Sequence, residues 1–346
     1  MAGGTGGHIF PALAVADQLR ENNWKVVWLG SKMGMESKLV PQYGFEMEWV
    51  RFSGLRGKGI LRALLLPISL LVALGQSARA IFRVRPDVVL GMGGYISFPG
   101  GLMAALLARP LILHEQNSVA GLANKVLARF ADRVLVAFPN ALPKAEWTGN
   151  PVRRDITQLV APEQRYEGRS GNLNLLVVGG SLGARVLNET VPRALALMPP
   201  SIRPNVTHQA GEQHLAMLER EYQLAGVTAT ALAFIRDMSS AYASADLVIC
   251  RAGALTVSEI AAAGVASVLI PFSFAVDDHQ TFNARYLSDR SAALLLPQPE
   301  LTPRKLADLL LRCTRAKLLE MAIKARALGK PDAAQVVAQR CMAIAV

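Results

Sequence analysis

Short aliphatic runs alternate with longer segments of helical periodicity along almost the whole chain. Uninterrupted runs of this kind are typical of strands buried on both faces of a parallel sheet, and the intervening helices cover those faces. The runs predict strands at 25–29, 87–90, 111–114 and 133–136 in the first half and at 173–178, 205–209, 246–250 and 267–270 in the second. Helices are predicted at 9–21, 97–107, 184–198 and 255–263.

This alternation predicts two similar α/β halves, each Rossmann-like with a parallel sheet, that face one another across an interdomain cleft. A chain of 346 residues is long for one core, and two domains of about 150 residues are the usual expectation. The turn-forming run Gly149-Asn150-Pro151 lies near the midpoint and marks the boundary. We therefore expect one domain over 1–149 and another over 150–330, with the C-terminal helix 331–346 packing back on the first.

Composition narrows the class of protein. Hydrophobic residues make up 51% and charged residues 18% of the chain, which suits a well-packed globular enzyme. Cys250, Cys313 and Cys341 lie far apart without zinc-like spacing, and we expect buried free thiols in a reducing compartment. No secretory leader is visible, and the longest uncharged apolar run, 63–75, is too short to span a bilayer. These features predict a cytosolic protein.

Positive charge is concentrated in the first half. The net charge is +11, and the stretch from Arg51 to Pro86 holds seven basic residues and no acidic one. Such a surface indicates an anionic partner: nucleic acid, anionic lipid or a phosphorylated substrate. Nucleic acid is disfavoured, because leucine and isoleucine separate the charges and stacking aromatic residues are lacking.

Glycine-rich turns recur where a predicted strand gives way to a helix. Glycine lets the backbone approach a ligand closely, and the following helix N-terminus offers unpaired N–H donors to phosphate groups. For a single loop, the plain preference of tight turns for glycine explains the pattern equally well, but four loops together favour anion binding. The four are Gly3-Gly4-Thr5-Gly6-Gly7-His8, Gly91-Met92-Gly93-Gly94-Tyr95, Gly179-Gly180-Ser181-Leu182-Gly183 and Arg251-Ala252-Gly253-Ala254.

Other nucleotide motifs do not fit. There is no G-x-x-x-x-G-K-[ST] run, and the stretch from Gly91 to Ile96 lacks the last glycine of a dinucleotide fingerprint. The sequence has no Asp-x-Asp pair for a metal-bound diphosphate. We therefore expect backbone N–H groups and arginine side chains to meet the diphosphate charge without a metal ion or other cofactor.

The first glycine loop begins at Gly3, although such loops usually leave the end of a strand. Only Met1 and Ala2 precede it. We expect a short apolar strand to be encoded upstream, so that the sequence reflects a late start site or a fragment.

The glycine loops form part of an ordered set of motifs that resembles glycosyltransferase family 28. The resemblance runs from Met1 to about residue 290 and is weaker in the C-terminal helices. Leu182 departs from the family pattern, in which glutamine usually follows the serine. The further motifs are His114-Glu115-Gln116-Asn117, Gly149-Asn150-Pro151-Val152-Arg153, the extension of the fourth loop to Glu259, and Asp278-His279-Gln280-Thr281-Phe282-Asn283-Ala284.

The resemblance implies a GT-B fold and a role in peptidoglycan synthesis. The implied reaction is an inverting, metal-independent transfer of GlcNAc from UDP-GlcNAc to the C4 hydroxyl of MurNAc in lipid I (undecaprenyl-pyrophosphoryl-MurNAc-pentapeptide), which gives lipid II. The first domain would bind the acceptor and the second would bind most of the donor. The enzyme would sit peripherally on the cytoplasmic face of the inner membrane.

For the first domain, the resemblance implies roles in three motifs. His8, in the first turn of a helix, would be the general base, or would only orient its loop. Glu115 would be an alternative base or a buried structural carboxylate, and Asn117 would contact donor or acceptor. The residues implied to approach the donor sugar and diphosphate are Thr5, Gly6 and Gly7.

For the second domain, the resemblance implies a nucleotide site. Arg153 and Ser181 would meet the diphosphate, and the backbone of Ile235 would contact the uracil. Glu259 would accept the ribose hydroxyls, or would only compensate the helix dipole. Gln280 and Asn283 would bind the GlcNAc hydroxyls. The remaining implied contacts lie at the start of the next helix: Ala254, Leu255, Thr256, Val257 and Ser258.

The segment from Arg51 to Pro86 resembles the family's membrane-facing patch, and its mixture of apolar and basic residues fits binding to an anionic leaflet. A core helix with a solvated basic edge is the alternative. The apolar members are Leu64, Leu65, Leu66, Ile68, Leu70 and Leu71, and the basic members are Lys58, Arg62, Arg79, Arg83 and Arg85.

Three other functions stay open at this point. Two are enzymes of the same fold, a UDP-GlcNAc 2-epimerase and a glycolipid glucosyltransferase. The third is a non-catalytic, membrane-associated scaffold that binds UDP-sugars.

Overall fold

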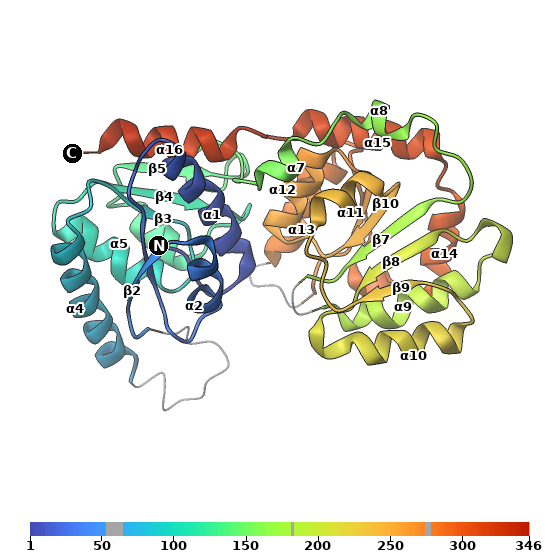
Figure 1. Cartoon of the computed structure of the whole chain (residues 1–346), viewed down its shortest axis with the longest axis horizontal. Helices are drawn as coiled ribbons and strands as arrows, with labels where there is room; N and C mark the ends of the chain where they lie inside the picture. The colour runs from blue at the N-terminus through green and yellow to red at the C-terminus, as the bar shows by residue number, and fades with distance from the viewer. Residues whose placement is uncertain (53–64, 181–182, 274–277, 346) are drawn as a thin grey trace. The chain divides into compact units, whose positions relative to one another are not determined.

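The structure is a computed structural model that describes residues 1–52, 65–180, 183–273 and 278–345 (Figure 1). The chain divides into two compact units. Unit 1 consists of Met1–Arg153 with Pro331–Val346, and unit 2 consists of Arg154–Lys330. Each unit is built on parallel strands connected by helices, which confirms the predicted α/β class.

Unit 1 contains two parallel sheets among its described residues. The larger has the strand order β3-β4-β5-β6, and the smaller pairs β1 with β2. The strands are β1 (Val27–Gly30), β2 (Glu46–Trp49), β3 (Val89–Gly91), β4 (Leu111–Glu115), β5 (Arg133–Val136) and β6 (Glu146–Trp147). The main helices are α1 (Gly6–Glu21), α2 (Glu36–Leu39), α4 (Leu66–Val84), α5 (Ser97–Leu106), α6 (Leu122–Leu127) and α16 (Ala333–Ile344).

Successive side chains in the larger sheet of unit 1 point to opposite faces, and each face packs against a different core cluster. Ile112 and Leu135 join a core cluster with residues of α1 and α16, such as Ile9 and Val337. Leu111 and Leu113 point the other way and join residues of α4, α5 and α6. The aliphatic runs of the sequence therefore mark strands covered on two sides, as expected for parallel strands.

Met1 lies beside β3. Its amino group donates to the Leu90 carbonyl at 2.8 Å, and its carbonyl accepts from the Met92 N–H at 2.8 Å. The Trp28 indole donates to the Ala2 carbonyl at 2.9 Å. The two residues ahead of the first glycine loop are thus held by strand-like pairing with β3.

Unit 2 has one six-stranded parallel sheet among its described residues, in the order β12-β11-β10-β7-β8-β9. Figure 1 shows α9 and α10 on the opposite side of this sheet from α11 and α12. The strands are β7 (Asn174–Val178), β8 (Asn205–Gln209), β9 (Thr230–Leu232), β10 (Leu247–Cys250), β11 (Ser267–Leu269) and β12 (Leu294–Leu295). The helices are α7 (Arg154–Thr157), α8 (Pro162–Tyr166), α9 (Arg185–Ala196), α10 (Leu215–Ala225), α11 (Met238–Ser244), α12 (Ala254–Ala263), α13 (His279–Ser288), α14 (Pro303–Leu311) and α15 (Arg315–Leu328).

The eight predicted strands and four predicted helices are confirmed, with ends that differ by up to three residues. The three cysteines are free thiols as expected; Cys250 and Cys341 are buried and Cys313 is half-buried. Within the described ranges, no helix is both long and apolar enough to cross a membrane.

Candidate functional site

The loop 3–8 of unit 1 ends at the N-terminus of α1. Thr5 is the N-cap residue in extended conformation, but its side chain makes no capping bond. Its hydroxyl oxygen lies instead 3.3 Å from Nδ1 of His8, in the first turn. Gly6 and Gly7 open the helix, so their N–H groups point along its positive end. The helix geometry thus presents an imidazole beside an anion-attracting helix terminus.

A buried carboxylate that the sequence analysis did not single out holds this loop. Glu36 is fully buried on α2. One of its oxygens accepts from the Gly4 N–H at 3.1 Å and the other from the Ser31 N–H at 3.0 Å. Glu36 thereby fixes the loop to the end of β1.

The second glycine loop, 91–95, packs directly on the first. A Cβ on Gly94 would lie 2.2 Å from the Gly3 carbonyl oxygen, and the φ angle of Gly94 is +81°. Only glycine fits such a contact and such a backbone angle. A Cβ on Gly93 would lie 2.6 Å from Cδ2 of His8. The glycines therefore let the loop after β3 close against the loop that carries His8.

The motif 114–117 spans the end of β4 and approaches the same place. The Glu115 carboxylate is 3% exposed. One oxygen accepts from the backbone N–H and the side-chain amide of Asn117, at 2.9 and 3.3 Å. The other accepts from the Gly121 N–H at 3.1 Å and the Asn124 amide at 2.9 Å. Glu115 thus ties together the loop 115–124, and Asn117 is part of that arrangement.

Arg153 belongs to unit 1, at the end of the motif that begins at Gly149. Its guanidinium carbon lies 5.6 Å from the centre of the Phe10 ring on α1. A cation is thus held against the helix that carries His8.

In unit 2, α12 provides the clearest anion-binding geometry. Its N-cap is Gly253, which has no side chain to cap the helix, and no acidic residue lies in the first turn. Ala254, Leu255 and Thr256 form that first turn. Their N–H groups face the end of β10, and a helix N-terminus of this kind attracts phosphate groups.

Glu259 lies further along α12 and is 7% exposed. One of its carboxylate oxygens accepts a hydrogen bond from the Tyr242 hydroxyl at 3.1 Å, and Tyr242 is fully buried on α11. Its neighbours on α12 face elsewhere: Val257 is fully buried and its N–H donates to the Gly253 carbonyl, while the Ser258 hydroxyl donates to the Ala254 carbonyl. Tyr242, which the sequence analysis missed, therefore fixes the orientation of Glu259.

A buried amide joins two loops of unit 2. Gln209, at the end of β8, is 3% exposed. Its amide nitrogen donates to the Gly180 carbonyl at 2.9 Å, and its amide oxygen accepts from the Ile235 N–H at 3.0 Å. The glycine loop after β7 and the segment after β9 are thus tied to one side chain. Ser181 and Leu182 lie outside the described residues.

Gly183, just before α9, lies against a chain of buried polar groups. A Cβ on Gly183 would lie 1.9 Å from the Ala210 carbonyl oxygen. The Asn188 amide donates to that carbonyl at 3.1 Å, so its oxygen accepts from Nε2 of His208 at 3.1 Å. Nδ1 of His208 then accepts from the Tyr222 hydroxyl at 2.9 Å. Burial lowers the pKa of His208 to about 3, which keeps this chain neutral.

Gln280 and Asn283, three residues apart on α13, both contact backbone. The Gln280 amide oxygen accepts from the Phe272 N–H at 2.9 Å. The Asn283 amide donates to the Ala252 carbonyl at 3.2 Å, and Asn283 is fully buried. Asn283 therefore holds the backbone that immediately precedes α12.

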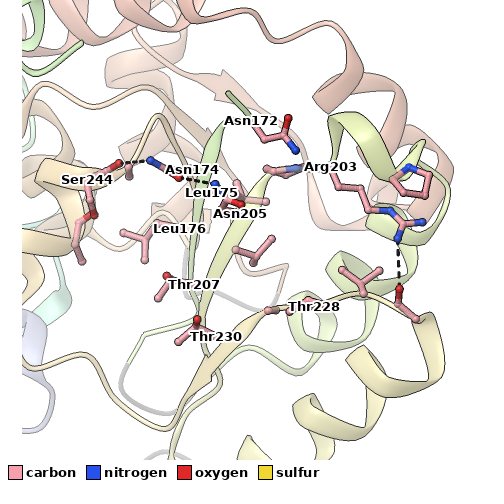
Figure 2. Close-up of a pocket in the computed structure, with 18 residues that line it drawn as sticks. Asn172, Asn174, Leu175, Leu176, Arg203, Asn205, Thr207, Thr228, Thr230 and Ser244 are labelled. Atoms are coloured by element: carbon pink, nitrogen blue, oxygen red, sulfur yellow. Dashed lines mark hydrogen bonds between the residues drawn. The ribbon is translucent and has the colours of Figure 1, made fainter. Parts of the chain in front are cut away.

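Within unit 2, these contacts gather the predicted residues at the carboxyl ends of β7, β8, β10 and β11, where ligands bind in sheets of this type. A cavity of about 710 Å³ lies elsewhere, at the amino ends of β7, β8 and β9. Figure 2 shows polar side chains in its lining: the Asn205 amide donates to the Asn174 amide oxygen, and the Asn174 amide donates to the Ser244 carbonyl. This cavity and the glycine loops therefore lie at opposite ends of the strands. The described parts of both units hold no cluster of three His, Cys, Asp or Glu side chains that could bind a metal ion.

Comparison with known proteins identifies two matching domains. Residues 1–136 match the glycosyltransferase family 28 N-terminal domain, and residues 174–337 match the C-terminal domain of the same family. A protein of Dechloromonas aromatica is 61% identical over 345 residues, covering 100% of this chain and 98% of its own. One of Ralstonia nicotianae is 62% identical over 348 residues, covering 100% and 95%. Both are named UDP-N-acetylglucosamine–N-acetylmuramyl-(pentapeptide) pyrophosphoryl-undecaprenol N-acetylglucosamine transferase.

Solved structures give the same result at the level of the fold. The crystal structure of Acinetobacter baumannii MurG is similar with a TM-score of 0.86 and 41% identity, over 99% of this chain and 98% of that one. The calicheamicin glycosyltransferase CalG4 is similar with a TM-score of 0.67 and 18% identity, over 99% and 96%. The expected GT-B fold is thereby confirmed.

Proposed function

The chain belongs to glycosyltransferase family 28, and on that premise we propose that it transfers GlcNAc from UDP-GlcNAc to the MurNAc residue of lipid I, giving lipid II. The observation that carries this proposal is the identity of 61% and 62% to relatives named for this transfer, over the whole of this chain. A 2-epimerase, a glucosyltransferase or a scaffold would not account for that match.

The reaction we propose is a single displacement with inversion. The C4 hydroxyl oxygen of MurNAc forms a bond to the anomeric carbon of GlcNAc, and the bond from that carbon to the diphosphate oxygen breaks. UDP leaves with the electron pair, and the hydroxyl proton passes to a base. Two tasks follow for the protein: to stabilise the departing diphosphate and to accept the proton.

We assign the first task to unit 2. The uncapped N-termini of α12 and α9 supply N–H donors and positive potential, which meet diphosphate charge without a metal ion. Glu259, oriented by Tyr242, would accept hydrogen bonds from the ribose hydroxyls. The predicted backbone contact of Ile235 to uracil would use its carbonyl, since its N–H already bonds Gln209.

We assign the second task to His8 of unit 1. The Glu115 carboxylate accepts four hydrogen bonds from its own loop, which fits the structural alternative better than a base that must take up a proton. Nδ1 of His8 lies 3.3 Å from the Thr5 hydroxyl oxygen, a group that can accept from the ring when it is charged.

We further propose that α4 binds the membrane surface. One face of this helix is exposed and carries large apolar side chains: Ile68 is 61%, Leu71 68% and Phe82 65% exposed. Arg79, Arg83 and Arg85 are exposed at its C-terminal end, and Arg83 forms an ion pair with Glu48. Apolar side chains flanked by arginine suit an anionic leaflet and a peripheral position on the inner membrane. Lys58, Arg62 and Leu64 lie outside the described residues.

UDP release with and without a lipid I analogue tests the proposal. We expect release to depend on the analogue and the product to contain GlcNAc linked to C4 of MurNAc. Formation of a ManNAc product would identify an epimerase, and transfer from UDP-glucose at a higher rate would identify a glucosyltransferase. Binding of UDP-GlcNAc without any turnover would leave only the scaffold.

A further inference from the structure

The buried amide of Gln116 has a hydrogen-bond acceptor that the protein itself does not use. Gln116 is 1% exposed. Its amide nitrogen lies 3.1 Å from Nδ1 of His114 and 3.2 Å from the His114 carbonyl oxygen. Its amide oxygen is buried and has no hydrogen-bond partner among the described residues. A buried acceptor left in this state costs about 1–3 kcal/mol, so a partner is expected during function.

Hydrogen-bond chemistry fixes which end of the amide is the oxygen. Nε2 of His114 lies 2.9 Å from the Gly149 carbonyl, which only accepts, so Nε2 carries the ring proton. Nδ1 is therefore an acceptor, and the atom opposite it must be the amide nitrogen of Gln116. Burial lowers the pKa of His114 to about 4, so the ring is neutral at neutral pH and the bond to Gly149 selects this tautomer. An exchanged amide would place its oxygen against two acceptors.

The unused oxygen and the His8 ring both lie close to Gly93. The position that a Cβ on Gly93 would take lies 3.0 Å from the Gln116 amide oxygen and 3.0 Å from Nε2 of His8. Both atoms therefore border the same small space above Gly93, which stays open because that residue has no side chain. The other ring nitrogen of His8, Nδ1, faces the Thr5 hydroxyl oxygen at 3.3 Å.

We propose that Gln116 is a positioning residue for the general base: its amide oxygen accepts the Nε2–H of the His8 imidazolium that forms when the attacking hydroxyl loses its proton. This inference rests on the proposed transfer reaction. The step requires that Nδ1, beside the Thr5 hydroxyl, takes up the proton while Nε2 already carries one, so the Gln116 amide oxygen is an acceptor for the Nε2–H of the imidazolium. Charge-assisted bonds of this kind are stronger than neutral ones, so Gln116 favours the protonated ring.

Other titratable groups near the loop are occupied elsewhere. Glu36 on α2 accepts from the Gly4 and Ser31 N–H groups. Tyr95 packs on Gly4, and burial raises its pKa. Arg153 lies against Phe10, and burial lowers the pKa of His114. Gln116 is thus the side chain whose loss should change the basicity of His8 most directly.

The test is an NMR titration of the His8 ring together with the pH profile of kcat. In Gln116→Leu the imidazolium loses an acceptor, so the ring becomes a weaker base. We expect the titration midpoint and the acidic limb of kcat to move down by about one pH unit, and kcat at neutral pH to fall about tenfold. The KM for UDP-GlcNAc should stay within about twofold, because Gln116 does not belong to the nucleotide site.

Two further variants make the result decisive. Gln116→Glu places a carboxylate oxygen near Nε2 and should move the midpoint up, which also gives a readout if Gln116→Leu does not fold. Gln209→Leu removes an equally buried amide from unit 2 and should leave the His8 midpoint unchanged. An unmoved midpoint in either folded Gln116 variant overturns the inference, as does a rise in the KM for the acceptor alone. The ring titration needs no turnover, so its outcome is separate from that of the proposed function.

Discussion

The interaction between Tyr242 and Glu259 allows the ribose assignment to be tested quantitatively. Glu259 is 7% exposed, and the hydroxyl of fully buried Tyr242 lies 3.1 Å from one of its oxygens. Charge-assisted hydrogen bonds contribute about 1.5–3 kcal/mol. Glu259→Ala removes such bonds to the ribose, so the KM for UDP-GlcNAc should rise at least tenfold, equivalent to about 1.4 kcal/mol. Tyr242→Phe leaves the carboxylate in place but less well oriented, and we expect a rise of about three- to tenfold.

The assay that separates this role from general destabilisation is inhibition by UDP and by its 2′-deoxy and 3′-deoxy analogues. The unmodified enzyme should prefer UDP, because each analogue lacks one hydroxyl that donates to the carboxylate. Glu259→Ala should lose the preference, and Tyr242→Phe should show a reduced one. Glu219→Ala, at an exposed position on α10, is the matched control and should keep it. A preference for UDP that survives in Glu259→Ala would refute the assignment, whatever happens to KM.

Three further results are expected. His8→Ala should lower kcat by about 10²-fold or more while UDP binding stays near normal, and a near-normal kcat would move the base elsewhere. Phe82→Glu on α4 should weaken sedimentation with anionic vesicles about tenfold, since burying a phenylalanine is worth about 1.5–3 kcal/mol, whereas Leu224→Glu on α10 should not. Burial lowers the pKa of His114 to about 4 and of His208 to about 3. Between these values and the ordinary value near 6.5 the unfolded chain binds more protons, so the free energy of unfolding should fall as pH drops below about 6.5 and be flat just above it.

The sequence predicted the strands and helices well because its aliphatic runs and glycine turns are local signals. It also placed the glycine loops at the carboxyl ends of strands, which a parallel sheet brings to one edge. It missed Glu36, Gln209 and Tyr242, whose bonds join residues that are 32, 29 and 17 positions apart. Nothing local in the sequence distinguishes these side chains from other polar residues, because each bonds to a segment that is distant along the chain.

The sequence pattern did not decide the role of α4. A core helix with a solvated basic edge and a membrane-binding helix with an exposed apolar face can have the same composition. The structure shows small side chains on its inner face, where Ala73, Ser77 and Ala80 are buried. Ile81 is buried with them, whereas the large apolar side chains of Ile68, Leu71 and Phe82 are exposed. Packing against the rest of unit 1 therefore determines which face of α4 is exposed to solvent. The sequence alone identifies the apolar and basic residues but not the face on which they lie.

The buried polar groups under the loops of unit 1 differ in how fully they are satisfied. Glu115 accepts four hydrogen bonds from its own loop. Its replacement should therefore act mainly on stability, because no acceptor capacity is left for a substrate or a base. Gln116 is held by its nitrogen, while its oxygen keeps that capacity beside Nε2 of His8. A buried acceptor without a partner calls for an explanation, and the charged His8 ring that forms during transfer would supply a donor close to it.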